Sequence, residues 1–209
     1  VVKIALKYND YILSDLAYAE IYYDNSPPPS ILQIPKAKEV AVEFTSMSKT
    51  YAMAGWRIGF AVGNKTLINA LTRIKSYLDY GAFTPVQVAA AAALNGPQDC
   101  VQEIRSTYQK RRDVLINSMA RAGWNIPSPK ASMFAWAPIP DKYKDKGSLE
   151  FAKELMLKAD VAVSPGVAFG EFGEGYLRIS YANSEENIKE AISSIRNFLE
   201  DNKWENAKN

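Results

Sequence analysis

The chain of 209 residues contains no histidine and only one cysteine, Cys100. Without histidine, neither a Ser-His-Asp triad nor a Cys-His pair can form, so acid–base chemistry would fall to Lys, Asp, Glu or Tyr. Only carboxylates and one thiol remain as metal ligands, so we expect no metal site. A single cysteine excludes an internal disulfide and fits a reducing compartment, and we therefore expect a cytoplasmic protein.

The sequence also lacks long apolar runs and a secretory leader, so we expect a soluble protein with no membrane partner. Lys+Arg 25 against Asp+Glu 23 leaves a net charge of only +2. The one tight basic cluster, residues 110–112, falls in an amphipathic helix pattern. We interpret this cluster as a solvated helix face and expect no nucleic-acid partner.

Apolar patterning and turn residues predict alternating strands and helices over most of the chain. We expect strands at residues 10–14, 38–44, 57–62, 132–136, 161–163 and 175–180, and helices at residues 65–94, 98–122, 148–158 and 185–199. The helical stretch 65–94 should break into two near residues 79–81 and at Pro85. Residues 1–8 are typical of the second half of an amphipathic helix, so we expect the sequence to begin partway through a longer protein.

The densest group of reactive side chains is Ser46-Met47-Ser48-Lys49, with Arg57 eight residues beyond the lysine. Hydroxyl groups and an arginine that follow a buried strand could converge on a phosphate, leaving the lysine free for covalent chemistry. The alternative is an ordinary solvated loop. Here residues 52–62 are mostly apolar or small, so the loop returns into a core. Loss of solvation makes a lysine amine more nucleophilic, and the expected product is a Schiff base.

Asp15 and Tyr18 lie where the preceding predicted strand gives way to a loop. Ligands of α/β sheets gather outside the carboxyl ends of the strands. Taken alone, the pair is more typical of a capping aspartate and a packed tyrosine. One strand later comes Lys49, so two consecutive strand ends could supply an acid, a phenol and an amine to one crevice.

Arg178 alternates with apolar neighbours in the predicted strand 175–180. It could point to solvent, as most strand arginines do. The glycines at positions 166, 170, 173 and 175 instead suggest tight backbone approach to something nearby. An arginine placed there is suited to bidentate recognition of a carboxylate.

In this order, Asp15-x-x-Tyr18, Ser46-x-Ser48-Lys49, Arg57 and Arg178 resemble the pyridoxal-phosphate aminotransferases of fold type I. Residues 44–64 and 165–180 are similar to the branch that includes aspartate, alanine and LL-diaminopimelate aminotransferases. The resemblance covers essentially the whole chain, and the lysine–arginine stretch is its most specific part.

The resemblance implies a role for each residue. Lys49 would hold pyridoxal 5'-phosphate as a Schiff base and would then move a proton between the substrate and the cofactor. Asp15 would pair with the pyridine nitrogen, and Tyr18 would hydrogen-bond the ring oxygen. Ser46 and Arg57 would bind the cofactor phosphate.

By the same resemblance, Arg178 would bind the α-carboxylate of the substrate, and the reaction would be amino transfer between an L-amino acid and a 2-oxo acid. Glutamate or alanine as donor, with 2-oxoglutarate or pyruvate as acceptor, is the expectation for the family. Aspartate or diaminopimelate remains possible.

Upstream elements of the family's site cannot be placed in this sequence, so the resemblance implies the C-terminal half of such an enzyme. The expected fold is α/β: residues 1–97 as the end of a large cofactor-binding domain with a mostly parallel sheet, and residues 98–209 as a long helix and a small α+β domain. A homodimer is also implied, in which residues 80–85 either approach the partner subunit or form an ordinary helix break.

Three other functions remain open. Related enzymes of this fold carry out elimination on the same cofactor, and fold alone cannot separate the two reactions. An aminotransferase-like domain could also serve as the effector-binding module of a transcription regulator. A noncatalytic fragment that only dimerises is disfavoured by the polar residues named above.

Overall fold

The computed structural model describes the backbone of residues 1–206 and the side chains of residues 1–200, so the end of the predicted 98–209 domain lies outside it. The chain forms two compact units, Val1–Arg105 and Ser106–Asn209. The predicted long helix is present as α6 (Asp99–Arg121), which begins in the first unit and ends in the second. The boundary between the structural units thus lies after Arg105, whereas the functional boundary that we predict after residue 97 stays a prediction.

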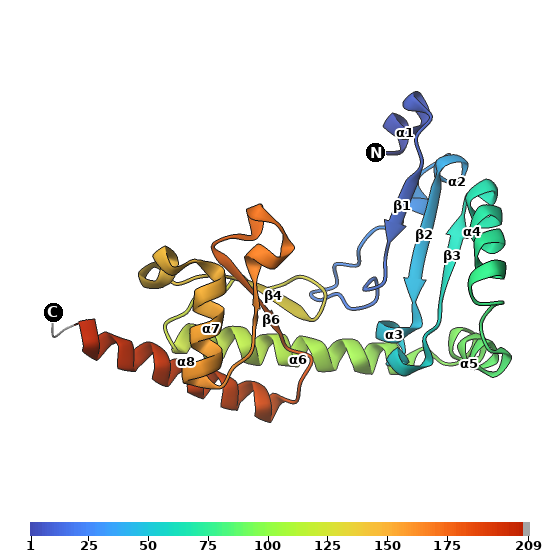
Figure 1. Ribbon diagram of the computed structural model, residues 1–209. Helices are drawn as coiled ribbons and strands as arrows, with labels where there is room; N and C mark the ends of the chain where they lie inside the picture. The colour runs from blue at the N-terminus through green and yellow to red at the C-terminus, as the bar shows by residue number, and fades with distance from the viewer. Residues whose placement is uncertain (207–209) are drawn as a thin grey trace. The chain divides into compact units, whose positions relative to one another are not determined.

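A three-stranded sheet organises the first unit, in the order β1 (Ile12–Asp15), β2 (Ala41–Ser46), β3 (Gly59–Gly63) (Figure 1). β1 and β2 are parallel, whereas β2 and β3 are antiparallel. The carboxyl ends of β1 and β2 and the start of β3 therefore share one edge of the sheet. The third strand starts later than predicted, because Arg57 has a left-handed backbone with φ 51° and cannot extend it.

The strand predicted at residues 38–44 is wrong over its first part. Residues Ala37–Val40 form the short helix α2, and the strand begins only at Ala41. The predicted N-terminal helix is confirmed as α1 (Val2–Tyr8). One buried cluster joins both helices to the sheet: Val2, Ala5, Ala37, Val40 and Ala41. Ala37, Lys38 and Glu39 favour helix over strand, and Ala37 and Val40 bury the apolar side of this helix in the cluster, so local propensity and packing agree here.

The helical stretch 65–94 breaks as predicted into α4 (Lys65–Leu78) and α5 (Thr84–Asn95). The side chain of Asn64 caps the first of them, since its Oδ1 accepts a hydrogen bond from Leu67 N at 3.0 Å. Pro85 lies in the first turn of α5, where a missing N–H breaks no helical hydrogen bond.

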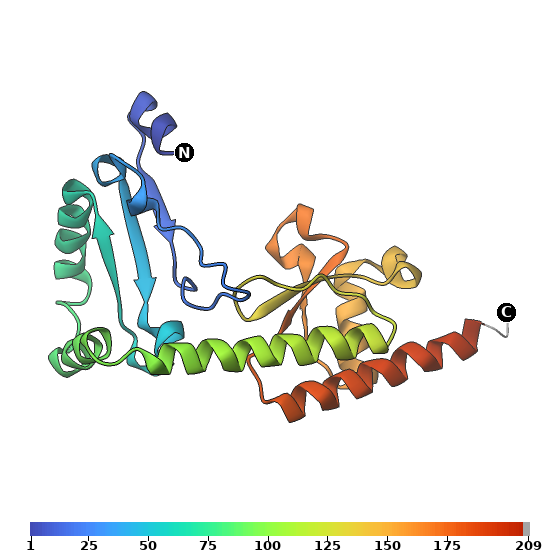
Figure 2. The same ribbon diagram turned by 180° about the vertical axis from the view of Figure 1, so that it is seen from behind.

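The second unit contains an antiparallel sheet in the order β4 (Phe134–Pro138), β6 (Tyr176–Ser180), β5 (Ser164–Pro165). Its helices are α7 (Gly147–Ala159) and α8 (Glu185–Asn206). Figures 1 and 2 both show α8 running beside the later part of α6. Alternate sheet residues are buried: Ala135, Ala137, Leu177 and Ile179. One sheet face thus packs into the unit, as expected for an α+β arrangement.

Residues 161–163, predicted as a strand, are not one. Asp160 takes a left-handed conformation with φ 54°, and Val161 N then donates to Leu155 O at 3.2 Å. This hydrogen bond closes the C-terminus of α7, so the residue is used to end a helix. Sheet pairing begins only at Ser164, which lies opposite Arg178.

Residues 110–112 are not the uniformly solvated face that the sequence suggested. Arg112 is only 5% exposed. Its Nη1 donates to Pro129 O at 3.2 Å, and its Nη2 lies 2.8 Å from a carboxylate oxygen of Asp113. The charge is buried because the guanidinium has acceptors within its own unit.

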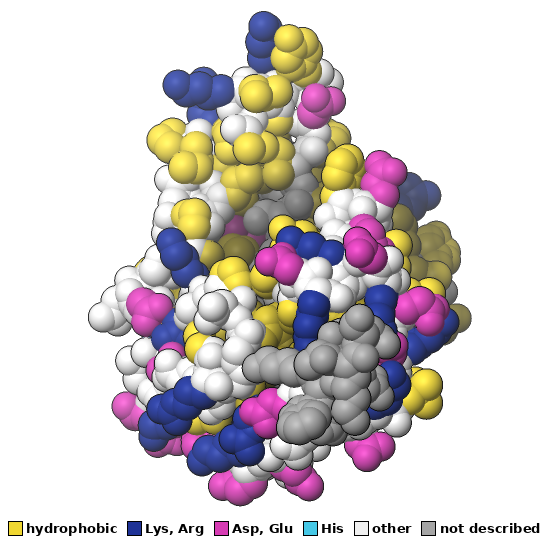
Figure 3. All heavy atoms as spheres, turned by 90° about the vertical axis from the view of Figure 1, so that its left-hand side faces the viewer, with side chains coloured by type: hydrophobic (Ala, Val, Ile, Leu, Met, Phe, Trp, Pro, Cys, Tyr) yellow, Lys and Arg dark blue, Asp and Glu magenta, His cyan; other side chains and the backbone are white. Residues whose placement is uncertain are grey.

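On the face drawn in Figure 3, acidic and basic side chains are interspersed and do not form one basic patch. None of the helices in the part of the chain that the structure describes has both the length and the apolar character needed to cross a membrane.

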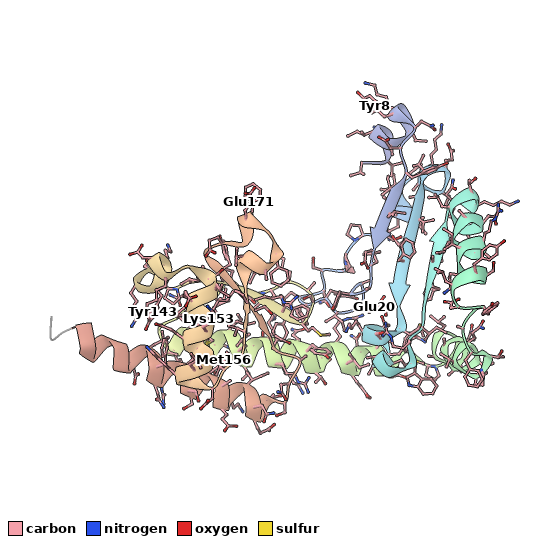
Figure 4. All side chains as sticks on the ribbon, in the orientation of Figure 1. Tyr8, Glu20, Tyr143, Lys153, Met156 and Glu171 are labelled. Carbon is pink, nitrogen blue, oxygen red and sulfur yellow. The ribbon has the colours of Figure 1, made fainter. Side chains whose placement is uncertain are left out.

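Aromatic rings fill the core of the second unit around Phe151, which is fully buried. The ring centroid of Phe151 lies 4.7 Å from that of Tyr143, which Figure 4 labels, and 5.7 Å from that of Trp124. The Phe198 ring completes the cluster at 6.3 Å from Phe151. These three neighbours come from separate segments of the chain, so Phe151 joins α7 to the rest of the unit.

The loop before β6 is held closed by two glycines. A Cβ at Gly166 would lie 1.9 Å from the carbonyl oxygen of Gly173, and a Cβ at Gly173 would lie 2.0 Å from that of Gly166. Only glycine allows this approach, which accounts for the tight backbone packing expected from the sequence. Glu171 lies at the outer end of the loop (Figure 4).

Glu174 fastens the same loop to the start of α7. Its carboxylate accepts hydrogen bonds from Ser148 N at 2.6 Å and from Ser148 Oγ at 3.0 Å. Ser148 Oγ in turn accepts one from Val167 N at 3.1 Å. Ser148 is fully buried, so these bonds satisfy a hydroxyl that would otherwise lack water.

Low pH should weaken the hydrogen bonds between Glu174 and Ser148. Hydrogen bonds from Gly175 N and Ser148 N lower the pKa of the Glu174 carboxyl below its ordinary value of 4.5. A lowered folded-state pKa contributes stability above the unfolded-state pKa, and this stability is lost as the pH falls through the folded-state value. We expect the melting-temperature difference between wild type and Glu174→Gln to shrink as the pH falls from about 6 to about 3. Glu171→Gln is the control. A difference that stays constant with pH would contradict this account.

Candidate functional site

Lys49 lies in a single helical turn, α3 (Met47–Thr50), directly after β2. Ser46, the last strand residue, caps the turn, because its Oγ accepts a hydrogen bond from Ser48 N at 3.1 Å. Met47, Ser48 and Thr50 are buried, whereas Lys49 is only half-buried. The turn is therefore anchored in the unit by its other residues, and its lysine keeps access to the surface.

Asp15 and Tyr18 follow the neighbouring strand β1. Asp15 pairs in register with Phe44 of β2, so it lies at the same sheet edge as the turn. Its Oδ1 accepts a hydrogen bond from Ala17 N at 3.0 Å, which shapes the loop that leads to Tyr18. The Nζ atom of Lys49 lies 5.5 Å from the centroid of the Tyr18 ring. The structure thus brings a phenol and an amine from two consecutive strand ends together, within range of a cation–π contact.

Ser46 and Arg57 lie at the two sides of one strand pair. Ser46 is opposite Gly59 in the β2–β3 pairing, and Arg57 precedes that glycine by two residues. The Arg57 side chain is exposed, and its Nη1 donates to Ala54 O at 2.9 Å. Ala54 belongs to a short 3₁₀ turn, Ala54–Trp56, between the lysine turn and β3. A hydroxyl and a guanidinium therefore lie at the sheet edge that also carries Lys49.

Arg178 belongs to the second unit, at the centre of its sheet. Its Nη2 donates to Ser164 Oγ at 3.3 Å, and its Cζ lies 4.5 Å from the ring centroids of both Phe134 and Phe169. The side chain is half-buried, so the solvent-pointing alternative does not describe it. The two aromatic contacts restrict the guanidinium without using its N–H groups, of which one donates to Ser164 and the others suit a planar anion.

The sequence interpretation missed these two aromatic contacts. Phe134 lies in the same strand as Trp136 at a spacing of two, a period that places both on one sheet face. Trp136 lies opposite Arg178 in the sheet, so this spacing places Phe134 on the same face as the arginine. Phe169 comes from the loop before β6, and no local pattern links it to Arg178.

A hollow of about 620 Å³ in the first unit is separate from these residues. Met47 and Thr50 line it, together with Glu20, Glu43 and Arg105, but Asp15, Tyr18 and Lys49 do not. We therefore base the candidate site on the sheet edge and not on this hollow. Among the residues that the structure describes, no three acidic or cysteine side chains gather as metal ligands would.

Solved structures define the class of this fold. The chain superposes on an aromatic aminotransferase from Pyrococcus horikoshii with a TM-score of 0.90 and 30% identity, covering 97% of this chain and 54% of that one. An aminotransferase from Staphylococcus aureus gives a TM-score of 0.85 and 34% identity, covering 93% and 52%. The predicted α/β fold class, that of part of an aminotransferase, is confirmed.

The family model for class I and II aminotransferases matches residues 1–195, and the chain belongs to this family. It is 57% identical to a putative aminotransferase, AatC, of Rhizobium meliloti, covering 95% of this chain and 49% of that protein. It is 54% identical to the glutamate–pyruvate aminotransferase AlaC of Escherichia coli (94% and 48%) and 46% identical to an LL-diaminopimelate aminotransferase of Moorella thermoacetica (95% and 50%). The chain spans about half the length of the curated relatives it matches.

Proposed function

We propose that the protein containing this chain transfers an amino group between an L-amino acid and a 2-oxo acid, with pyridoxal 5'-phosphate held on Lys49. The observation that carries the proposal is the position of the Lys49 amine, 5.5 Å from the Tyr18 ring at the carboxyl ends of two parallel strands. Ligands of α/β sheets bind at such strand ends. Membership of the aminotransferase family supports the reaction.

The side chains at this edge suit the cofactor. An acid, a phenol, an amine, a hydroxyl and a guanidinium gather there, from Asp15, Tyr18, Lys49, Ser46 and Arg57. A pyridine nitrogen, a ring oxygen, an aldehyde and a phosphate would each find a partner of suitable chemistry in that set. Lys49 would hold pyridoxal phosphate through its amine, and the bound cofactor would supply an electron sink for the substrate carbon.

The remaining steps belong to the protein. Asp15, as a carboxylate, would hold the proton on the pyridine nitrogen, and the Tyr18 hydroxyl would donate to the ring oxygen. Ser46 and Arg57 would hold the phosphate and so fix the ring in place. Once its amine is free, Lys49 would accept the proton from the substrate α-carbon and return it.

Arg178 would bind the α-carboxylate of the substrate through a bidentate hydrogen bond. The support is its half-buried guanidinium, restricted by Phe134 and Phe169 within the second unit. We assign residues 1–97 to the cofactor-binding domain and residues 98–209 to the long helix and the small domain.

For substrates, we propose glutamate or alanine as donor with 2-oxoglutarate or pyruvate as acceptor. The glutamate–pyruvate relative is more similar to this chain than the diaminopimelate relative, at 54% against 46% identity. The named relatives favour amino transfer over elimination and over an effector-binding module. We also propose a homodimer located in the cytoplasm.

The test uses the longest natural product of the gene. It is incubated with pyridoxal phosphate, reduced with borohydride and digested, and the modified peptide is located by mass spectrometry. We expect one pyridoxyl group on Lys49, with Lys65, an exposed lysine in the same unit, as the internal reference. A product that carries no adduct, or carries it only on other lysines, would reject the proposal.

A further inference from the structure

The Lys49 turn has a side-chain anchor at its far end. Tyr51 follows the turn directly, and its hydroxyl donates to Gln98 Oε1 at 2.7 Å across 47 positions of sequence. The backbone N–H of Tyr51 also donates to Met47 O at 3.2 Å, which closes the turn. One residue therefore both ends the turn and ties it to a distant segment of the first unit.

Gln98 is itself fixed in place. Its Nε2 donates to the carbonyl oxygens of Gly96 at 2.7 Å and Ala93 at 3.0 Å, at the C-terminus of α5. The backbone carbonyl oxygen of Gln98 accepts a hydrogen bond from Val101 N in the first turn of α6. These bonds supply partners for carbonyls at a helix end, and they hold the Oε1 acceptor in a defined position.

The hydroxyl of Tyr51 is protonated and can donate its hydrogen bond. Burial raises its pKa above the ordinary value of 10.0, so it keeps its proton at neutral pH. Met47 and Ser48, buried and joined to β2, fix the start of the turn. The hydrogen bond to Gln98 fixes its end, and Lys49 lies between the two fixed points.

We propose that Tyr51 and Gln98 are positioning residues for Lys49. Their hydrogen bond ties the turn to the α5–α6 junction and so holds the lysine amine beside the Tyr18 ring. The inference rests on the proposed function in one respect, namely that Lys49 is the amine that reacts. Both residues act through the turn, because neither is among the residues assigned to cofactor or substrate above.

The test compares Tyr51→Phe, which keeps the ring and removes only the hydroxyl, with the exposed tyrosine variant Tyr11→Phe as control. The first readout is the rate at which a borohydride-trapped pyridoxyl group forms on Lys49. The second is the rate at which acetic anhydride acetylates Lys49 without cofactor, measured by peptide mass spectrometry. Lys65 is the internal reference, and melting temperatures verify that each variant is folded.

The two rates should change in opposite directions. In Tyr51→Phe we expect cofactor adduct formation to slow by about three- to tenfold, the factor that corresponds to the net free energy of one hydrogen bond. The rate falls because a smaller fraction of molecules has the Lys49 amine beside the Tyr18 ring. Acetylation of Lys49 should accelerate by a similar factor because the opened turn exposes the amine, while acetylation of Lys65 stays unchanged. General destabilisation would instead lower the melting temperature of Tyr51→Phe relative to Tyr11→Phe, because Lys65 is already exposed and its acetylation does not respond to unfolding.

A double-mutant cycle identifies the partner. Gln98→Leu should reproduce both effects, and the double variant should be no worse than either single variant. Additive effects, or Lys49 acetylation in Tyr51→Phe within twofold of wild type, would overturn the inference. If wild type forms no adduct while Tyr51→Phe still accelerates the acetylation of Lys49, the proposed function is rejected. The positioning of the lysine by Tyr51 then stands.

Discussion

Replacing Lys49 by alanine should lower the amino-transfer rate of the complete protein by roughly a thousandfold or more. The reason is that the proposed covalent attachment and the proposed proton transfer both depend on this one amine. The measurement is the single-turnover conversion of an amino acid to its 2-oxo acid with saturating pyridoxal phosphate. The borohydride-trapped pyridoxyl group should be lost from the same variant.

The fold should tolerate this change. Lys49 is half-buried, and the turn is anchored by Met47 and Thr50, so we expect the free energy of unfolding to fall by at most about 1 kcal/mol. Lys65→Ala, which removes an exposed lysine of the same unit, is the matched control and should retain full activity. If Lys49→Ala still transfers amino groups at the wild-type rate, the proposed mechanism is wrong.

Phe151→Ala should have the largest effect on stability, about 3–5 kcal/mol in the free energy of unfolding. The side chain is fully buried, and its ring lies within 6.3 Å of three other rings, so truncation removes contacts from three segments and leaves a cavity. Urea denaturation followed by tryptophan fluorescence, to which Trp124 beside the truncated ring contributes, would measure the loss.

Leu157→Ala is the control for Phe151→Ala. Leu157 lies on the same helix but is 76% exposed, so its truncation should change stability by less than about 1 kcal/mol. Similar losses from the two variants would show that the aromatic cluster does not dominate the stability of the second unit. Phe151→Leu should fall between them, because it keeps part of the buried volume.

Local patterns predicted which elements form, but not all of their bounds. The break between α4 and α5 follows from glycine and proline, which limit the backbone by themselves. Residues 38–40 were assigned to a strand, but Lys38 and Glu39 favour helix and Val40 packs against α1 as part of α2. Val161 was assigned to a strand, yet its N–H closes the end of α7. The first error overlooks residues that favour helix, whereas the second depends on how the preceding helix ends.

For the candidate site too, sequence predicted some features and only the structure revealed others. Motif order singled out Lys49 and Tyr18, and the structure places the amine beside the ring, while the roles of both residues stay predictions. Sequence could not reveal that Tyr51 bonds to Gln98 or that Phe169 contacts Arg178, because the partners are distant in sequence. Residues with a proposed chemical role could be recognised by their type, whereas the contacts that hold them in place depend on the fold.

The left-handed backbone of Arg57 has a consequence for how selection acts on this loop. For any residue except glycine this conformation costs about 1–2 kcal/mol, and the Arg57 side chain is exposed, so burial of the side chain does not compensate. Stability alone would therefore favour glycine at this position. An arginine here costs stability, and the proposed role of its guanidinium in holding the cofactor phosphate would account for that cost.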